Sequence, residues 1–468
     1  MDAVDQAALV AAGEASPSEL LEAAIERIER IDPALNAVVI RWFDHARATA
    51  ASDLPDGPFR GVPFLLKDLF AEYAGQPISN GNVAFRKARV IADADTTLVS
   101  RYRAAGLVIA GRTNSPELGS VPTTEPVAWG PTHNPWDTTR TPGGSSGGAA
   151  AAVAAGMVPF AHASDGGGSI RIPASCCGLV GLKPSQGRIT LGPNRDESGL
   201  SVQHCVSRTV RDSAALLDAT RGPGIGDTVI APAPTRPYVE ELGADPGRLR
   251  VGLLDHHPQG GPVDAECTTA ARNAGALLES LGHIVEPAWP KALEDSTSGT
   301  AFGAMWSANM GVSRRRFSEQ LGRPLEDDEF EPMNRVQADF ATHFSSVDYA
   351  LALSAATQYR RAMQSWWYDG WDLLLTPTLA ELPLKLGTLA NDPDQPMAVM
   401  RRAGQFVPFT PPFNMSGQPA ISLPLEWTAD GLPVGVQLVA AYGREDVLLR
   451  VASQLEQANP WIGRIPNI

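Results

Sequence analysis

Two short glycine-rich segments, residues 143–148 and 165–171, constrain this chain more than any other feature of its 468 residues. Each segment contains a small hydroxyl residue bedded in glycine, Ser145 in the first and Ser169 in the second. Glycine lets the backbone approach another chain or a ligand closely, and it adopts φ values that other residues avoid. A serine that follows three glycines is therefore exposed on tight backbone, where several N–H groups can point at one spot. Acyl transfer needs this combination of a nucleophile and an oxyanion-binding site.

A flexible loop or a phosphate-binding turn is the alternative interpretation of residues 143–148. A P-loop ends in Gly-Lys-Ser or Gly-Lys-Thr, whereas Gly148 is followed by a run of alanines. Serine also needs a base to accept its proton, and histidine is the usual one. None of the eight histidines of the chain lies in a recognisable hydrolase motif.

Further motifs surround the two glycine-rich segments in a fixed order. The segment 61–68 places Lys67 after an apolar run, and the segment 143–187 contains both serines. Together the motifs resemble the amidase signature family, although the match is thin between about 220 and 400. The run 165–178 is most similar to the 6-aminohexanoate cyclic-dimer hydrolase branch of that family. Other segments that carry the resemblance are 111–117, 134–137, 204–212, 414–420 and 431–437.

The resemblance implies a Ser-cisSer-Lys triad that works without a metal or organic cofactor. Ser169 is then the nucleophile, Ser145 follows a cis peptide bond and relays protons, and Lys67 is the base. Lys67 must be neutral to act, and its place after the apolar run 62–66 makes burial plausible. A lysine that reaches solvent from a strand end is the competing interpretation. The oxyanion hole is expected from the backbone of Gly166, Gly167, Gly168 and Ser169, with Ser146, Asp165 and Arg171 as supporting residues.

The same resemblance leads us to expect hydrophobic, uncharged substrates. Gly166 stands where the family more often has Thr or Ile, which suggests more space beside the nucleophile. By family position Gly119 and Ser120 approach the acyl pocket, and both are small. Met305 and Trp306 belong to an aromatic and Met-rich region that fits an apolar pocket, although ordinary helix packing is the alternative. Expected substrates are small amides or carbamates, including linear amides, anilides, urethanes and nylon-type oligomers. Esters are expected to react as well.

Two other functions remain possible at this stage. The chain could be the amidase subunit of a glutamine-dependent tRNA transamidase, which would need a partner subunit and a charged clamp for glutamine. It could also be a non-catalytic binding protein on the same scaffold, but the complete set of Lys67, Ser145 and Ser169 argues against this.

The net charge of −14, without a basic stripe, disfavours nucleic-acid binding. The longest apolar run, 149–161, is rich in alanine and interrupted by Gly156 and Pro159, so we expect no membrane segment. The acidic N-terminus does not resemble a signal peptide, and we expect a cytoplasmic protein. The sequence does not distinguish between a monomer and a homodimer.

Strand-like and helix-like segments alternate, which indicates an α/β fold. The resemblance specifies the amidase signature fold, a central twisted mixed β-sheet covered on both faces by helices. We expect a single domain, 1–468, with a core of about 55–220 and 370–455. A variable region spans about 290–400, and a Pro/Gly-rich connection spans about 222–248. Ser16, Pro17 and Glu19 predict a helix start, and the pair Asp32 and Pro33 predicts its end.

Overall fold

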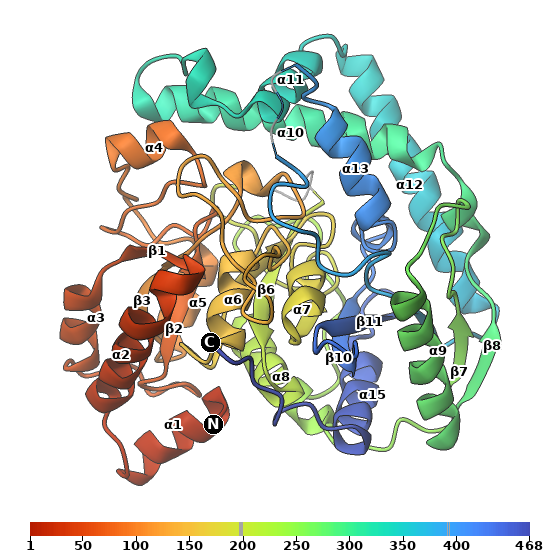
Figure 1. Ribbon diagram of the computed structural model, residues 1–468, viewed down its shortest axis with the longest axis horizontal. Helices are drawn as coiled ribbons and strands as arrows, with labels where there is room; N and C mark the ends of the chain where they lie inside the picture. Colours follow the sequence, from red (N-terminus) through yellow and green to blue (C-terminus); the bar gives the residue numbers. More distant parts are fainter. Residues whose placement is uncertain (196–199, 391, 393) are drawn as a thin grey trace.

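The computed structural model describes residues 1–195, 200–390, 392 and 394–468 (Figure 1). An eight-stranded sheet forms its centre, with the strand order β4-β6-β5-β10-β11-β9-β7-β8. Pairing is antiparallel from β4 to β9 and parallel from β9 through β7 to β8, so the predicted mixed sheet is confirmed. The strands are β4 (Phe160–Asp165), β5 (Val180–Lys183), β6 (Val202–Ser207), β7 (Arg250–Leu253), β8 (Ile284–Pro287), β9 (Leu373–Pro377), β10 (Ala420–Trp427) and β11 (Pro433–Ala440).

A second, three-stranded sheet lies beside β4 and was not predicted as a separate sheet. Its strands are β1 (Val38–Arg41), β2 (Pro63–Lys67) and β3 (Val108–Thr113), in the order β1-β3-β2. All five residues of β2 are buried, as expected of an apolar run in the middle of an α/β protein. Because Lys67 is the last residue of this buried strand, its position lies in the interior of the protein.

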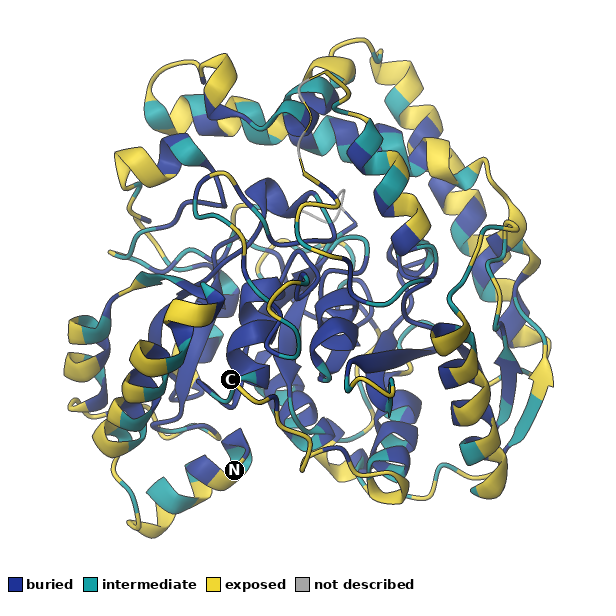
Figure 2. Ribbon diagram, viewed as in Figure 1, coloured by how far each residue is buried: buried dark blue, intermediate teal, exposed yellow. Residues whose placement is uncertain are grey.

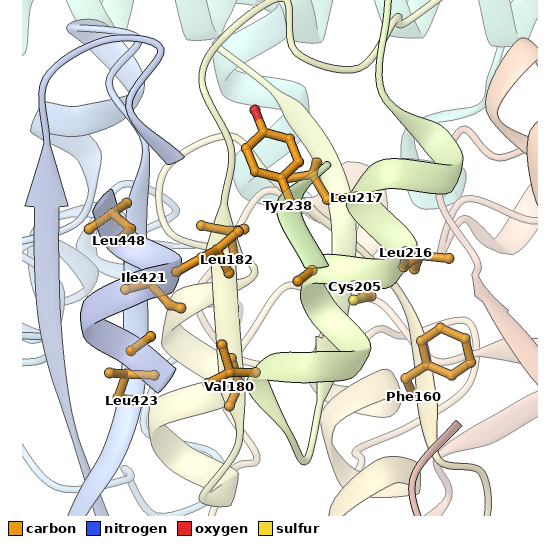
Figure 3. Close-up of a cluster of buried hydrophobic side chains, with 14 of the residues drawn as sticks. Phe160, Val180, Leu182, Cys205, Leu216, Leu217, Tyr238, Ile421, Leu423 and Leu448 are labelled. Carbon is orange, nitrogen blue, oxygen red and sulfur yellow. The ribbon is translucent and has the colours of Figure 1, made fainter. Parts of the chain in front are cut away.

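Helices cover both faces of the central sheet. Successive strand residues point to opposite faces, so Cys205 packs into the cluster that contains α8 (Val210–Thr220) and α15 (Glu445–Ala458). Its neighbour Val206 packs into the other cluster, with α6 (Gly147–Ala154) and α7 (Arg171–Cys177). Figure 3 shows side chains of α8 and α15 meeting those of the strands. The glycine-rich segments thus lead directly into α6 and α7 against the sheet.

Amphipathic helices form the outer shell, and Figure 2 shows exposed residues on their outward faces. The helix α2 begins at the predicted capping box of Ser16 and Glu19, but its predicted end at Pro33 is wrong. The helix continues to Leu35, where the Asn36 N–H donates to Asp32 O and closes the final turn. The Asp32 carboxylate accepts from the N–H groups of Ala37 and Val38 beyond the helix. Together with α2 (Pro17–Leu35), the outer shell contains α1 (Ala3–Ala12), α3 (Phe43–Ala50), α4 (Val83–Ala88), α5 (Thr97–Ala104) and α9 (Ala265–Ser280).

Long helices arch over one side of the molecule, within the predicted variable region of about 290–400 (Figure 1). They are α10 (Ser298–Leu321), α11 (Pro332–Ala341) and α12 (Ser346–Tyr368), joined by α13 (Ala398–Phe406) and α14 (Pro411–Met415). Residues 222–248 contain one short 3-10 helix, η2 (Tyr238–Glu241). Among the described residues, no helix has the length and apolar character needed to cross a bilayer.

Candidate active site

Lys67 lies at the centre of the site, and its side chain is fully buried. Its Nζ atom lies 2.7 Å from Ser145 Oγ and 3.0 Å from Ser164 Oγ. Burial lowers the pKa of Lys67 well below 10.5, since the negative charge of Asp165 only partly opposes the loss of solvation. The interior position excludes the competing interpretation of a lysine that reaches solvent.

A buried histidine fixes the backbone of this lysine, and sequence reasoning did not find it. The Lys67 N–H donates to His162 Nδ1 at 3.2 Å, and His162 Nε2 lies 2.6 Å from Gln203 Oε1. Burial lowers the pKa of His162 to about 3, although Gln203 acts in the opposite direction. The ring is therefore neutral at ordinary pH, accepts at Nδ1 and donates at Nε2. It orients β2 and does not reach a serine hydroxyl.

Ser145 follows a cis peptide bond from Gly144, as the resemblance implies. Gly119 approaches this serine so closely that a Cβ atom at position 119 would lie 3.0 Å from Ser145 Oγ. Gly119 also has a φ of +66°, which favours glycine. The small size of residue 119 therefore makes room for Ser145, and Gly119 also lines the cavities beside Ser169. The Ser146 hydroxyl hydrogen-bonds to the backbone of Ser164 rather than to Lys67.

The loop of residues 165–169, named the oxyanion loop after its predicted role, is held from inside by the Asp165 carboxylate. Asp165 accepts from the N–H groups of Gly168 at 2.7 Å and Ile170 at 3.2 Å. The Gly168 N–H is therefore occupied, which corrects the prediction that it faces an oxyanion. By contrast, the N–H groups of Gly166, Gly167 and Ser169 have no acceptor within the described part of the chain. Three donors thus remain next to the Ser169 hydroxyl.

Arg171 completes this anchor with a fully buried ion pair to Asp165. Two of its nitrogens donate to the two carboxylate oxygens, both at 2.9 Å. Burial raises the pKa of Asp165, but the charge and hydrogen bonds of Arg171, together with Lys183 and Asn414, outweigh it and hold this pKa at about 2. The predicted structural role of the pair agrees with this geometry.

Two residues from the C-terminal part of the chain tie the loop down further. Thr410 Oγ1 donates to Gly167 O at 2.7 Å, and Asn414 Nδ2 donates to Asp165 O at 2.9 Å. Arg171 also donates hydrogen bonds to these two residues, at Thr410 O and Asn414 Oδ1. The motif 414–420 was recognised in the sequence, but nothing in it indicated contact with a loop more than 240 residues away.

Ser169 lines two cavities. One has a volume of about 840 Å³ and is lined by Ser145, Ser164 and several charged side chains. The other has a volume of about 330 Å³, is mainly apolar, and includes Ser120 in its wall. Gly119, Ser169 and Trp306 line both cavities.

Of the two pocket residues predicted on α10, Trp306 lines the cavities and Met305 does not. Trp306 packs on the oxyanion loop, since a Cβ atom at Gly166 would lie 3.4 Å from its ring. The indole of Trp306 therefore occupies the space that was expected beside Ser169. The prediction that Met305 binds substrate is not supported, because its side chain is 5% exposed and packs into a core cluster with Leu200 and Tyr359.

Comparison with known proteins identifies the family. A family model described as amidase matches residues 19–449. A 6-aminohexanoate-cyclic-dimer hydrolase from Paenarthrobacter ureafaciens is 45% identical over 477 positions, covering 100% of this chain and 96% of that protein. The chain belongs to the amidase signature family. This amidase is an enzyme that hydrolyses amide bonds, which excludes the non-catalytic alternative.

Solved structures agree with the fold of this amidase. A structure of 6-aminohexanoate cyclic dimer hydrolase superimposes with a TM-score of 0.97 at 44% identity, covering 100% of this chain and 98% of that chain. A bacterial aryl acylamidase superimposes with a TM-score of 0.87 at 28% identity, covering 98% of this chain and 96% of that one. The predicted amidase signature fold is confirmed.

Proposed function

We propose that this amidase works through an acyl-enzyme on Ser169, with Ser145 as proton relay and Lys67 as base. The observation that supports this most directly is the 2.7 Å contact between the buried Lys67 Nζ and Ser145 Oγ. A lysine whose pKa is lowered by burial can hold a neutral amine, and a neutral amine accepts a proton from a hydroxyl.

In the first half-reaction Lys67 takes the proton of Ser145 while Ser145 takes the proton of Ser169. The Ser169 oxygen forms a bond to the substrate carbonyl carbon, and the carbonyl electron pair moves to the oxygen. The N–H groups of Gly166, Gly167 and Ser169 stabilise that oxyanion, at about 2.7–4 kcal/mol per donor in other hydrolases. When the tetrahedral intermediate collapses, the C–N bond breaks and the nitrogen takes a proton from Ser145. Lys67 then returns its proton to Ser145.

Water releases the acyl group in the second half-reaction. It gives a proton to Ser145, which passes its own to Lys67, and the water oxygen attacks the acyl carbon. Collapse of the second intermediate breaks the ester bond, and Ser169 regains its proton through Ser145. The products are a carboxylic acid and an amine, and the step needs no further reactant.

We propose uncharged amides with an apolar acyl group as substrates, including nylon-type oligomers without a free ammonium group, such as the 6-aminohexanoate cyclic dimer. The apolar cavity beside Ser169 and the 45% identity to the cyclic-dimer hydrolase support this class. Anilides, esters and aryl carbamates with similar groups should also react, because one methylene changes binding in such a pocket by only about 1–3 kcal/mol.

We further propose that the amidase acts on free small molecules in the cytoplasm, as a monomer or homodimer, without nucleic acid or membrane. The net charge of −14 supports the absence of nucleic-acid binding.

A kinetic panel tests the substrate class. We expect acyl anilides, aryl carbamates and the 6-aminohexanoate cyclic dimer to give higher kcat/KM values than glutamine. A preference for glutamine would contradict the proposal and favour the transamidase subunit.

A further inference from the structure

We infer that the two cavities divide the substrate, with the acyl group in the apolar cavity and the leaving amine in the larger, charged cavity. The inference rests on the proposed function, because it uses Ser169 as nucleophile and Ser145 as proton donor. It adds a substrate class: amides that join an apolar acyl chain to an amine bearing a polar or charged end.

The position of Ser145 decides which cavity receives the amine. The leaving nitrogen must take its proton from Ser145, so this nitrogen has to lie next to the Ser145 hydroxyl. Within the described part of the chain, Ser145 and Ser164 line the 840 Å³ cavity and do not line the 330 Å³ cavity. The amine arm of the substrate therefore extends into the larger cavity, and the acyl arm takes the opposite direction.

The walls of the larger cavity suit a polar amine. Glu72, Asp93 and Glu319 contribute carboxylates, and Arg195 and Arg316 contribute guanidinium groups. Side chains of both signs can solvate a charged or amide-bearing end that is several bonds from the scissile nitrogen.

The walls of the smaller cavity suit an unfunctionalised acyl chain. Ile172, Phe302, Val407 and Met415 are among its lining residues, and no charged side chain of the described residues lines it. A carboxylate placed there would lose its hydration without gaining a partner, which is costly.

Trp306 separates the two arms. It lines both cavities, packs against Gly166 and stacks on Phe302 with ring centroids 5.5 Å apart. Phe302 in turn lies against Gly167, since a Cβ atom there would be 3.7 Å from its ring. One turn of α10 thus places two aromatic rings on the oxyanion loop: Trp306 where both cavities meet it, and Phe302 in the wall of the smaller cavity.

Two isomeric amides test the division. N-hexanoyl-6-aminohexanoate carries its carboxylate on the amine arm, and the monohexylamide of adipic acid carries it on the acyl arm. We expect kcat/KM to be at least tenfold higher for the first. Equal values or the opposite preference would overturn the inference.

Hexananilide and a fluorophosphonate separate this inference from the proposed function. If both isomers are inert but hexananilide is hydrolysed and the fluorophosphonate labels the enzyme, the division is wrong and the acyl-enzyme mechanism stands. If nothing is hydrolysed or labelled, the proposed function fails and the inference fails with it.

Variants of Trp306 test the separating role. W306A should reduce the preference between the isomers to less than threefold, and W306F should retain it within twofold. W427A is the matched control, because Trp427 is also a partly buried indole whose N–H has no partner among the described residues, yet it lines neither cavity. If W306A keeps the tenfold preference, or W427A loses it equally, Trp306 is not the divider.

Discussion

Replacing Arg171 with Met should uncouple the oxyanion loop from the rest of the fold. The Arg171 guanidinium makes five hydrogen bonds, to Asp165 Oδ1 and Oδ2, Thr410 O, Asn414 Oδ1 and Gln437 Oε1. Met replaces the aliphatic part of the arginine side chain but not the guanidinium, so R171M leaves the Asp165 carboxylate buried without its counter-ion. Breaking a buried pair in this way costs about 3–5 kcal/mol.

The change in melting temperature can be calculated from that free energy. Unfolding entropy of about 2.1 cal/mol/K per residue gives about 1 kcal/mol/K for the 468 residues, so Tm should fall by about 3–5 °C. Loss of the loop geometry should also slow acylation. Misplacing one oxyanion donor costs about 10²–10³-fold in rate, so we expect at least a 100-fold slower reaction with a fluorophosphonate.

Arg188 provides the matched control for R171M. It forms a second buried pair with Glu445, and the two side chains are 3% and 0% exposed. Neither residue lines either cavity. R188M should therefore lower Tm by a similar amount while leaving acylation within threefold of the parent enzyme, as measured by differential scanning fluorimetry and stopped-flow labelling. Equal acylation rates in R171M and R188M would refute the positioning role of Arg171.

Other predictions concern protons and space at the site. The kcat/KM should rise with pH as Lys67 loses its proton, and should level off well below pH 10.5 because burial lowers the pKa of Lys67; a profile still rising at pH 10.5 would contradict a neutral lysine. K67A should lose most activity, and amides should suffer more than esters, since a poor leaving group needs the proton relay; a chelator should have no effect in the same assay. Burial lowers the pKa values of His162 and His204 to about 3, so the unfolded chain binds protons below pH 6.5 that the native state does not. The buried carboxyl groups of Glu117, Asp212 and Glu456 have raised pKa values and act in the opposite direction, so the histidine contribution is measured against a variant. As pH decreases from 6.5 toward 3, Tm should change less favourably in the parent enzyme than in H204Q, and equal changes would exclude a buried neutral His204. G166T should lower kcat/KM because its side chain displaces Trp306, and W306A in the same chain should restore part of the loss; a fully active G166T would show that the indole is not fixed.

The sequence predicted well those features that depend on local pattern. The capping box at Ser16, the buried strand before Lys67 and the alternating strands and helices are encoded within a few residues each. The pattern was misleading where a side-chain contact decided the outcome. The helix α2 passes Pro33 and ends at Leu35, and the Asp32 carboxylate stabilises this end by accepting from the N–H groups of residues 37 and 38.

The site was less predictable because its supporting residues are far apart in sequence. Thr410 and Asn414 reach the oxyanion loop only through the fold, and His162 contacts Lys67 only because β4 lies beside β2. Met305 and Trp306 were not distinguishable by composition. Adjacent residues of a helix point about 100° apart, so one enters the core and the other reaches the cavities.

Mapping the residue that becomes acylated tests the central claim most directly. The enzyme is treated with a fluorophosphonate, its intact mass is measured, and the modified peptide is sequenced by tandem mass spectrometry. The proposed mechanism predicts one adduct, on Ser169, that is absent from S169A although this variant keeps the parent Tm. An adduct on another residue, or an equally labelled S169A, would contradict the assignment of Ser169 as the nucleophile.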